Sequence, residues 1–201
     1  MKIAIGQIGT DADKTANFAL VAQAVITAAM NHARLILFPE ATMRAFGTGR
    51  LDEIAEPLDG PFVSALAGLA KNYNIAIVVG MFRPADQHVV SGRTINRVYN
   101  TTVAICPDGT VVHYDKIHTY DAFGYRESDT IKPGETLVTF TYNTVTFGLA
   151  TCYDLRFPQQ FRQLARRGAD IILVPTSWAD GPGKLQQRQL LIRARALDAT
   201  S

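Results

Sequence analysis

The sequence predicts an α/β protein in which two β-sheets are covered by helices on their outer faces. Strand and helix signals alternate along the 201 residues, and two pairs of strand signals are joined by short turns that predict hairpins. Alternation interrupted by hairpins is typical of mixed sheets rather than purely parallel ones. No linker, low-complexity segment or internal repeat divides the chain, so we expect a single domain over residues 1–201.

The first half of the chain contains three strand signals and two helix signals. Short apolar runs predict buried strands over residues 2–8, 35–38 and 75–81. A stripe of apolar residues at helical spacing predicts a helix over 13–33. A second helix is expected over 61–73, because this segment begins with proline, which suits an early helical position.

The second half contains both hairpins and the last helices. One hairpin joins strands over 98–105 and 110–116 through a Pro-Asp-Gly turn, and the other joins strands over 137–141 and 145–151. The remaining elements are expected as a helix, a strand and a helix over 158–167, 171–175 and 184–199. Specificity is expected to reside in three loops, over 41–51, 83–93 and 119–128.

Composition argues against several classes of protein. The hydrophobic fraction of 47% and charged fraction of 19% are those of a soluble globular protein, and a net charge of +2 gives no case for nucleic-acid binding. No stretch approaches the roughly 20 apolar residues of a membrane span. The first ten residues do not resemble a signal peptide, and two cysteines in such a chain predict a reducing, cytoplasmic environment.

Cys152 is the most informative residue of the chain. It follows an apolar strand signal and precedes Pro158, a good first helical residue, so it lies where a strand turns toward a helix. Such strand ends are where α/β sheets place their ligands. The positive end of the helix and the charge of Arg156 are expected to stabilise the thiolate. A buried structural cysteine is the alternative, and we assign that role to Cys106, whose only charged sequence neighbour is Asp108.

Two further reactive side chains follow predicted strands in the same way. Glu40 comes directly after the strand signal that ends in Phe38-Pro39, and Lys116 closes the strand over 110–116. A carboxylate, an amine and a thiol form a set suited to acyl chemistry. The carboxylate can take the thiol proton and deliver it to a leaving amine, the thiolate can attack a carbonyl or nitrile carbon, and the ammonium can stabilise the oxyanion.

These motifs resemble those of the nitrilase superfamily of carbon–nitrogen hydrolases. Phe38-Pro39-Glu40 is similar to its glutamate motif, the segment from Tyr114 to His118 to its lysine motif, and the segment from Thr151 to Pro158 to its cysteine motif. The resemblance implies a four-layer α-β-β-α sandwich, catalytic roles for Glu40, Lys116 and Cys152, and a second catalytic glutamate, which Glu127 before Pro133-Gly134 fits. It also implies at least a homodimer. Because family members continue beyond residue 201, the C-terminal part of their fold is expected to be absent from this chain.

Within the superfamily, the segment from Cys152 to Pro158 resembles the branch that contains deaminated glutathione amidase and ω-amidase. This resemblance implies hydrolysis of a small, carboxylate-bearing amide without a cofactor. Tyr153-Asp154 stands where nitrile-cleaving members usually have Trp-Glu, which favours an amide over a nitrile substrate. We expect Arg156 to bind a substrate carboxylate through two parallel hydrogen bonds, with Tyr153 beside it in the substrate site.

Three alternatives stay open. A nitrilase or N-carbamoyl hydrolase of the same superfamily would use the same nucleophile. A peptidase-like enzyme would pair Cys152 with His118, and a catalytically silent binding protein could share the fold. No metal is expected, since the spacing of the four histidines does not suggest ligands, and Gly183-Lys184 lacks the rest of a phosphate-binding loop.

Overall fold

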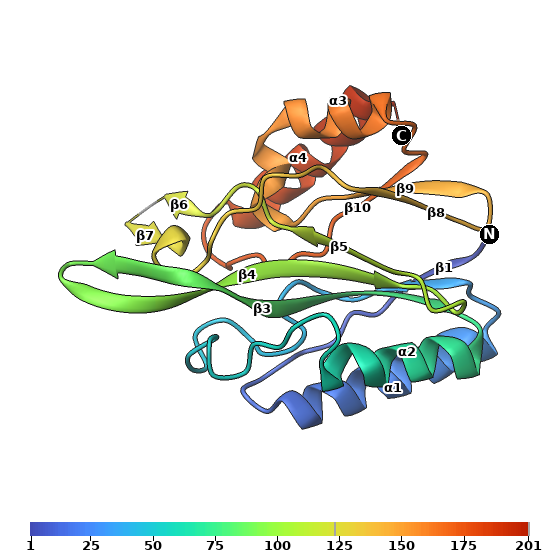
Figure 1. The fold of residues 1–201 in the computed structure, drawn as a ribbon. Helices are drawn as coiled ribbons and strands as arrows, with labels where there is room; N and C mark the ends of the chain where they lie inside the picture. Colours follow the sequence, from blue (N-terminus) through green and yellow to red (C-terminus); the bar gives the residue numbers. More distant parts are fainter. Residues whose placement is uncertain (123, 201) are drawn as a thin grey trace.

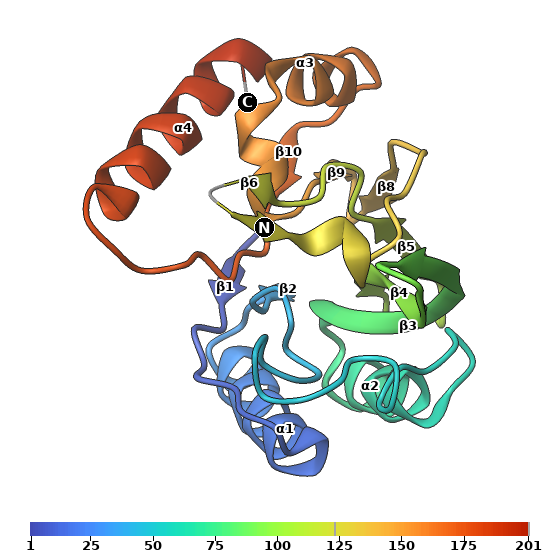
Figure 2. The same ribbon diagram turned by 90° about the vertical axis from the view of Figure 1, so that its left-hand side faces the viewer.

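The computed structural model describes residues 1–122 and 124–200 and has four layers. Two sheets lie face to face, with one pair of helices on the outer side of each (Figure 1). The first pair is α1 (Lys14–Met30) and α2 (Pro61–Tyr73). The second pair is α3 (Pro158–Arg166) and α4 (Lys184–Ala199), on the opposite side of the molecule (Figure 2). This arrangement confirms the predicted α-β-β-α sandwich.

The larger sheet contains five strands in the order β1-β2-β3-β4-β5. Their bounds are β1 (Ile3–Ile5), β2 (Leu35–Leu37), β3 (Ala76–Val90), β4 (Arg93–Ile105) and β5 (Val111–Asp115). The first three strands are parallel to one another, whereas β3, β4 and β5 are antiparallel. The mixed sheet and the β4–β5 hairpin are therefore confirmed, while β1 is shorter than the expected strand over 2–8.

The second sheet contains three strands in the order β10-β9-β8. It is formed by β8 (Thr139–Tyr142), β9 (Val145–Leu149) and β10 (Ile171–Leu173), with β8 antiparallel and β10 parallel to β9. Short elements connect the sheets: strands β6 (Asp121–Ala122) and β7 (Tyr125–Arg126), and the 3-10 helices η1 (Glu127–Asp129) and η2 (Cys152–Arg156). The predicted loop over 119–128 is thus partly regular.

Three apolar layers fill the spaces between the four structural layers. One lies between α1, α2 and the larger sheet, one between the two sheets, and one between the smaller sheet and α3, α4. Strand β3 contributes to two of them in alternation, since Ile77 and Val79 face the helices while Ala76 and Val78 face the other sheet. A strand buried on both faces reads as a continuous apolar run, which is why this strand was predictable.

The expected loop over 83–93 is the clearest error of the sequence-based prediction. Instead, β3 and β4 continue as a long hairpin that projects beyond the rest of the sheet (Figure 1). Ser91 and Gly92, both with positive φ, form its two-residue turn, as hairpins of this length prefer. The extension is largely polar and exposed, so it lacks an apolar pattern, and Pro84 lies at the shift in strand register.

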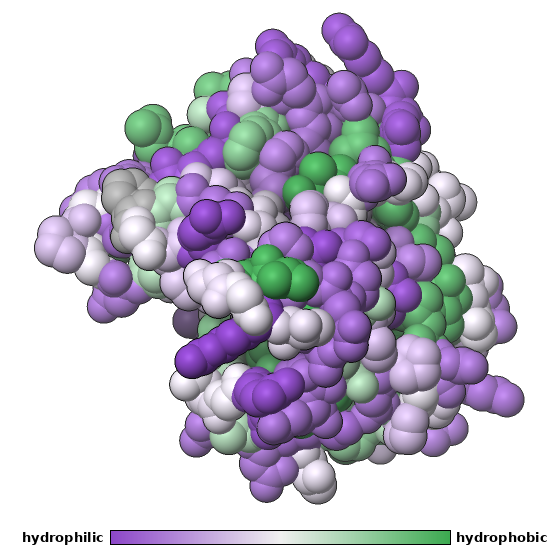
Figure 3. Space-filling view, turned by 60° about the vertical axis from the view of Figure 1, so that its left-hand side comes forward, coloured by the Kyte–Doolittle hydropathy of each residue, from purple (hydrophilic) through white to green (hydrophobic). Residues whose placement is uncertain are grey.

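The surface near this hairpin is largely hydrophilic, with apolar side chains in small separate patches (Figure 3). No helix among the described residues has the length and apolar character needed to cross a membrane.

Candidate active site

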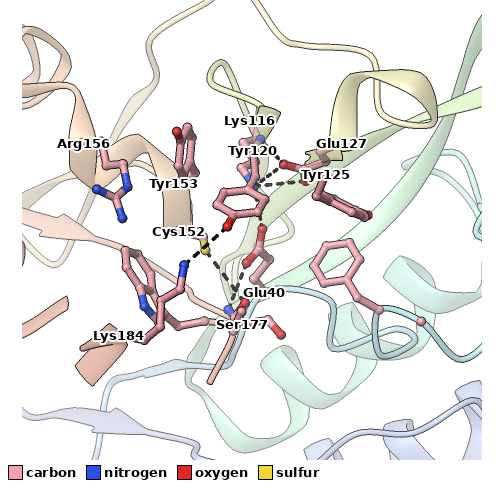
Figure 4. Close-up of a pocket in the computed structure, with 14 residues that line it drawn as sticks. Glu40, Lys116, Tyr120, Tyr125, Glu127, Cys152, Tyr153, Arg156, Ser177 and Lys184 are labelled. Carbon is pink, nitrogen blue, oxygen red and sulfur yellow. Dashed lines mark hydrogen bonds and ion pairs between the residues drawn. The ribbon is translucent and has the colours of Figure 1, made fainter. Parts of the chain in front are cut away.

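The ends of three strands bring the predicted catalytic side chains into one cavity. Glu40 follows β2, Lys116 follows β5, and Cys152 follows β9 at the start of η2. With Glu127, they line a cavity of about 420 Å³ that lies between the two sheets' strand ends and the segment leading to α4. Figure 4 shows the four side chains converging from these separate segments. The structure therefore assembles the whole set that the motifs predicted.

Lys116 is the central cation of the cluster. Its ammonium donates to Oε1 of Glu40 at 3.1 Å and to both carboxylate oxygens of Glu127, at 3.0 and 2.9 Å. The side chain is 2% exposed. Burial opposes its charge, but the carboxylates of Glu40 and Glu127 outweigh this effect and raise the pKa of Lys116 above its ordinary value. Lys116 is therefore a permanent ammonium in the resting site.

Glu40 accepts three hydrogen bonds from three different elements. Oε1 accepts from Lys116 and, at 2.8 Å, from the side-chain amide of Asn100. Oε2 accepts from the backbone N–H of Ser177 at 2.9 Å. Glu40 itself is 2% exposed, so these donors, rather than water, hold its carboxylate in place.

Cys152 occupies a strained turn that places its thiol in the cavity. Its φ of +45° is unusual for a residue with a side chain, and its backbone N–H donates to Pro175 at 3.0 Å. The thiol lies 3.9 Å from the carbonyl oxygen of Ser177. Non-glycine residues with positive φ often mark functional positions, because surrounding contacts must hold the strain.

The expected stabilisation of the thiolate by Arg156 and the helix end is wrong for the resting site. Burial raises the pKa of Cys152 well above its ordinary value, and the negative charge of Glu40 raises it further. Lys116 acts in the opposite direction without cancelling these effects. Cys152 is consequently a thiol at rest, and a base beside it is needed to ionise it.

A second buried network lies behind the nucleophile and is centred on Asp154. Its Oδ2 accepts from the Thr151 N–H and from the Tyr114 hydroxyl, both at 2.7 Å, and its Oδ1 accepts from the N–H of His118 at 3.1 Å. Asp154 is fully buried, so it depends on these donors. The network ties the segment after β5 to the turn that carries Cys152.

His118 belongs to this network and not to the cavity lining. Its Nδ1 lies 2.7 Å from Oδ1 of Asp154, and its ring stacks on Phe157 with centroids 3.6 Å apart. Among the described residues that line the cavity, His118 does not occur. This position favours the positioning role over the alternative in which His118 is the base for Cys152.

Arg156 and Tyr153 lie in the cavity wall. The guanidinium of Arg156 lies 5.5 Å from the Tyr153 ring centroid and 5.7 Å from that of Trp178, and its Nη2 donates to Gln187 of α4 at 2.8 Å. Asp154, the acidic residue nearest to Arg156 in sequence, accepts hydrogen bonds from other donors. The predicted role of Arg156 in substrate binding remains a prediction that this position permits.

Further side chains and one backbone donor line the cavity: Phe46, Tyr120, Tyr125, Ser177, Trp178 and Lys184. The first three lie in the loops over 41–51 and 119–128, in which specificity was expected to reside. Ser177, Trp178 and Lys184 were not anticipated, because only the folded arrangement brings their segments to the cavity. Lys184 lies over the Tyr120 ring, with its ammonium 5.6 Å from the ring centroid. Within the described part of the chain, no cluster of three or more His, Cys, Asp or Glu side chains could hold a metal ion.

Comparison with known proteins defines the class to which this fold and site belong. A family model described as carbon-nitrogen hydrolase matches residues 2–200. The chain belongs to the carbon–nitrogen hydrolase family, and its relatives and structural neighbours include amidases of the nitrilase superfamily. It is therefore a hydrolase acting on carbon–nitrogen bonds other than peptide bonds.

Individual relatives share most of the chain. A hydrolase of Mycobacterium tuberculosis (strain ATCC 25618 / H37Rv) is 44% identical over 204 residues, covering 100% of this chain and 70% of its own length. The deaminated glutathione amidase of Escherichia coli O157:H7 is 32% identical over 203 residues, covering 100% of this chain and 74% of its own length.

Solved structures give the same result. The structure of an amidase from Nesterenkonia sp. superposes with a TM-score of 0.81 at 26% identity, covering 100% of this chain and 73% of that chain. Variants of the Nesterenkonia amidase have been solved in complex with butyramide and with the acetamide moiety of fluoroacetamide added covalently at the active-site cysteine.

Proposed function

We propose that this protein hydrolyses a small, carboxylate-bearing amide to an acid and ammonia through a thioester on Cys152. The observation that carries the proposal is the shared cavity of Glu40, Lys116 and Cys152, in which a thiol, an ionised carboxylate and an ammonium lie within one hydrogen-bonded cluster. The covalent modification of the active-site cysteine by fluoroacetamide in a Nesterenkonia amidase variant supports a nucleophilic cysteine.

In the first half of the proposed reaction, Glu40 removes the proton from Sγ of Cys152, and the sulfur attacks the amide carbon. The carbonyl oxygen becomes an oxyanion, which the ammonium of Lys116 stabilises. Glu40 then passes its proton to the amide nitrogen as the carbon–nitrogen bond breaks. Ammonia leaves, and the acyl group remains on Cys152 as a thioester.

In the second half, Glu40 takes a proton from a water molecule that attacks the thioester carbon. The carbon–sulfur bond breaks, the thiol of Cys152 is restored with that proton, and the acid leaves. We assign to Glu127 the task of holding the Lys116 ammonium toward the oxyanion, because both of its oxygens bind that group. No cofactor enters this scheme.

The proposed substrate class rests on the charge at the other side of the cavity. Arg156 and Lys184 both line it, together with Tyr153 and Trp178. A guanidinium can hold a carboxylate through two parallel hydrogen bonds, and the aromatic rings can cover a short aliphatic chain. The relative named deaminated glutathione amidase agrees with such a substrate.

A paired substrate screen tests this proposal. Small ω-amides with and without a distal carboxylate are compared with N-carbamoyl compounds and nitriles, in wild type and in the variant Arg156→Lys. We expect the acidic amides to be hydrolysed best, and Arg156→Lys to raise their KM far more than that of neutral amides. Equal losses on charged and neutral amides, or a lower Tm with unchanged kinetics, would assign Arg156 a structural role. Absence of turnover on every compound would favour a silent binding protein.

We also propose a homodimer or higher homo-oligomer in the cytoplasm. The oligomer follows from the family resemblance, and the location from the presence of two free cysteines. Size-exclusion chromatography with light scattering tests the first of these, and a single peak at the monomer mass of 22.0 kDa would contradict it.

A further inference from the structure

A buried asparagine connects the members of the catalytic cluster. Asn100 lies on β4, is 1% exposed, and stands opposite Phe82 of β3 in the sheet. Its side-chain Nδ2 donates to Oε1 of Glu40 at 2.8 Å and to Oε1 of Glu127 at 3.3 Å. Its backbone carbonyl accepts from the N–H of Lys116 at 2.9 Å. One uncharged residue thus contacts all three charged members of the cluster.

The charges of the cluster explain why a neutral donor is needed there. Two buried carboxylates share the single ammonium of Lys116, and the thiol of Cys152 is neutral at rest. A buried carboxylate that lacks donors takes up a proton instead. An amide NH2 group has two N–H donors and no charge, so it can serve both carboxylates without adding a cation that would compete for Glu40.

The orientation of the amide is fixed by the same two carboxylates. If the amide were turned over, Oδ1 would face two carboxylate oxygens and would repel both. In the observed orientation Oδ1 is buried without a hydrogen-bond partner. A buried oxygen without a hydrogen bond destabilises the fold, and an apolar side chain of similar size would avoid that cost. Packing alone therefore does not explain why asparagine stands at this position.

The bond to Asn100 also distinguishes the two oxygens of Glu40. Oε1 receives both Lys116 and Asn100, whereas Oε2 receives the N–H of Ser177, the residue whose carbonyl lies beside the thiol of Cys152. Ser177 thus contacts both Oε2 of Glu40 and the thiol of Cys152.

We propose that Asn100 is a positioning residue that holds the carboxylate of Glu40 in the orientation that faces Cys152. The proposal rests on the proposed function in taking Glu40 as the base, and it predicts how the activation of the thiol depends on pH. The negative charge of Glu40 raises the pKa of Cys152, so a Glu40 side chain that is no longer held toward the sulfur leaves the thiol easier to ionise. The pH at which Cys152 becomes a thiolate then falls.

The test follows the rate of Cys152 alkylation by iodoacetamide against pH, read by mass spectrometry. Three proteins are compared: wild type, Asn100→Ala, and the isosteric Asn100→Asp. The control is Asn96→Ala, which removes the same side chain from an exposed position on the same strand. We expect the midpoint of the rise in alkylation to move down by roughly one pH unit in Asn100→Ala, because the charge of Glu40 then acts less strongly on the thiol.

In Asn100→Asp the midpoint should instead move upward, since a third carboxyl group adds negative charge near the thiol. Asn96→Ala should keep the wild-type midpoint. If Asn100→Ala does not fold, Asn100→Asp still tests the inference, because aspartate has the same shape as asparagine. An unchanged midpoint in the folded variant, even with a lower Tm, overturns the inference and leaves a structural role.

Alkylation needs no substrate, so the two proposals fail separately. Shifted midpoints in a protein that hydrolyses none of the screened compounds would support the role of Asn100 while contradicting the amidase proposal. If wild-type protein hydrolyses the acidic amides but the Asn100 variants keep the wild-type alkylation midpoint, the amidase proposal is supported and the role of Asn100 is contradicted.

Discussion

Two cysteines follow strands of this fold, and their surroundings differ in a way that explains which one can react. Cys106 follows β4, is 4% exposed and has a pKa raised to about 11, first by burial and then by the charge of Asp108. Cys152 follows β9 and also has a raised pKa, again first through burial. Burial therefore acts on both thiols in the same direction.

The difference lies in the groups beside each sulfur. Cys106 lies among apolar residues in the layer between the sheets. Cys152 shares its cavity with Glu40 and Lys116, a carboxylate that can accept its proton and an ammonium that can stabilise the negative charge formed later. The comparison favours the proposal that reactivity in this fold comes from a base beside the thiol, since the resting pKa of Cys152 is raised and not lowered.

The largest effect is expected from removing the thiol of Cys152, and removing the thiol of Cys106 is the control. Cys152→Ala should abolish turnover while the fold is kept, since alanine fits where a small thiol stood. Cys106→Ala should retain activity, because no catalytic group lies beside it. Steady-state kinetics with circular dichroism of both variants make the measurement. Full activity in both would show that the nucleophile is assigned wrongly.

Glu40→Gln should be nearly as damaging as the loss of Cys152. The amide keeps the shape of the side chain but does not accept the proton of the thiol. The comparison is sharpened by measuring Cys152 alkylation beside kcat, because loss of the negative charge of Glu40 should make the thiol easier to ionise while turnover falls. A variant that keeps the wild-type kcat would show that Glu40 is not the base.

Lys116→Ala should lower kcat by at least about 100-fold, because it removes the charge that stabilises the oxyanion. His118→Ala should cost less, since that side chain binds Asp154 and acts through positioning. The ratio of the two losses separates the amidase from the enzyme that would pair Cys152 with His118. The reverse order of losses would favour that second enzyme.

The smallest expected effect concerns Cys106 and stability at high pH. The unfolded chain loses this thiol proton near its ordinary pKa of 9.0, whereas the folded protein keeps it up to about 11. Between these values the unfolded state binds fewer protons, so the free energy of unfolding falls as pH rises. Cys106→Ala should remove this part of the slope in urea unfolding measured across that range. Identical slopes in both proteins would mean that Cys106 is not shielded in the fold.

Much of the site could be predicted because its chemistry lies at strand ends. The segments before Glu40, Lys116 and Cys152 are short and apolar, so strand, end and reactive residue are readable together. The pKa of Cys152 could not be read in this way. It depends on burial and on a carboxylate more than a hundred residues away in sequence, and both arise only in the folded chain.

Asn100 and Ser177 were missed for a related reason. Neither stands beside a motif, and each reaches Glu40 only through sheet pairing or through the path of the chain after β10. The β3–β4 extension was missed because its stability comes from cross-strand pairing of polar residues, as in Gln87 with Asn96, which gives no apolar alternation.

The most direct test of the account is to trap the thioester and locate it. Wild-type protein is mixed with an acidic ω-amide, quenched in acid within the first turnover, digested and analysed by mass spectrometry. The account predicts an acyl group on the peptide that contains Cys152, none on the peptide that contains Cys106, and none in Cys152→Ala. Turnover with no acyl group on Cys152, or with the acyl group on another residue, would contradict it.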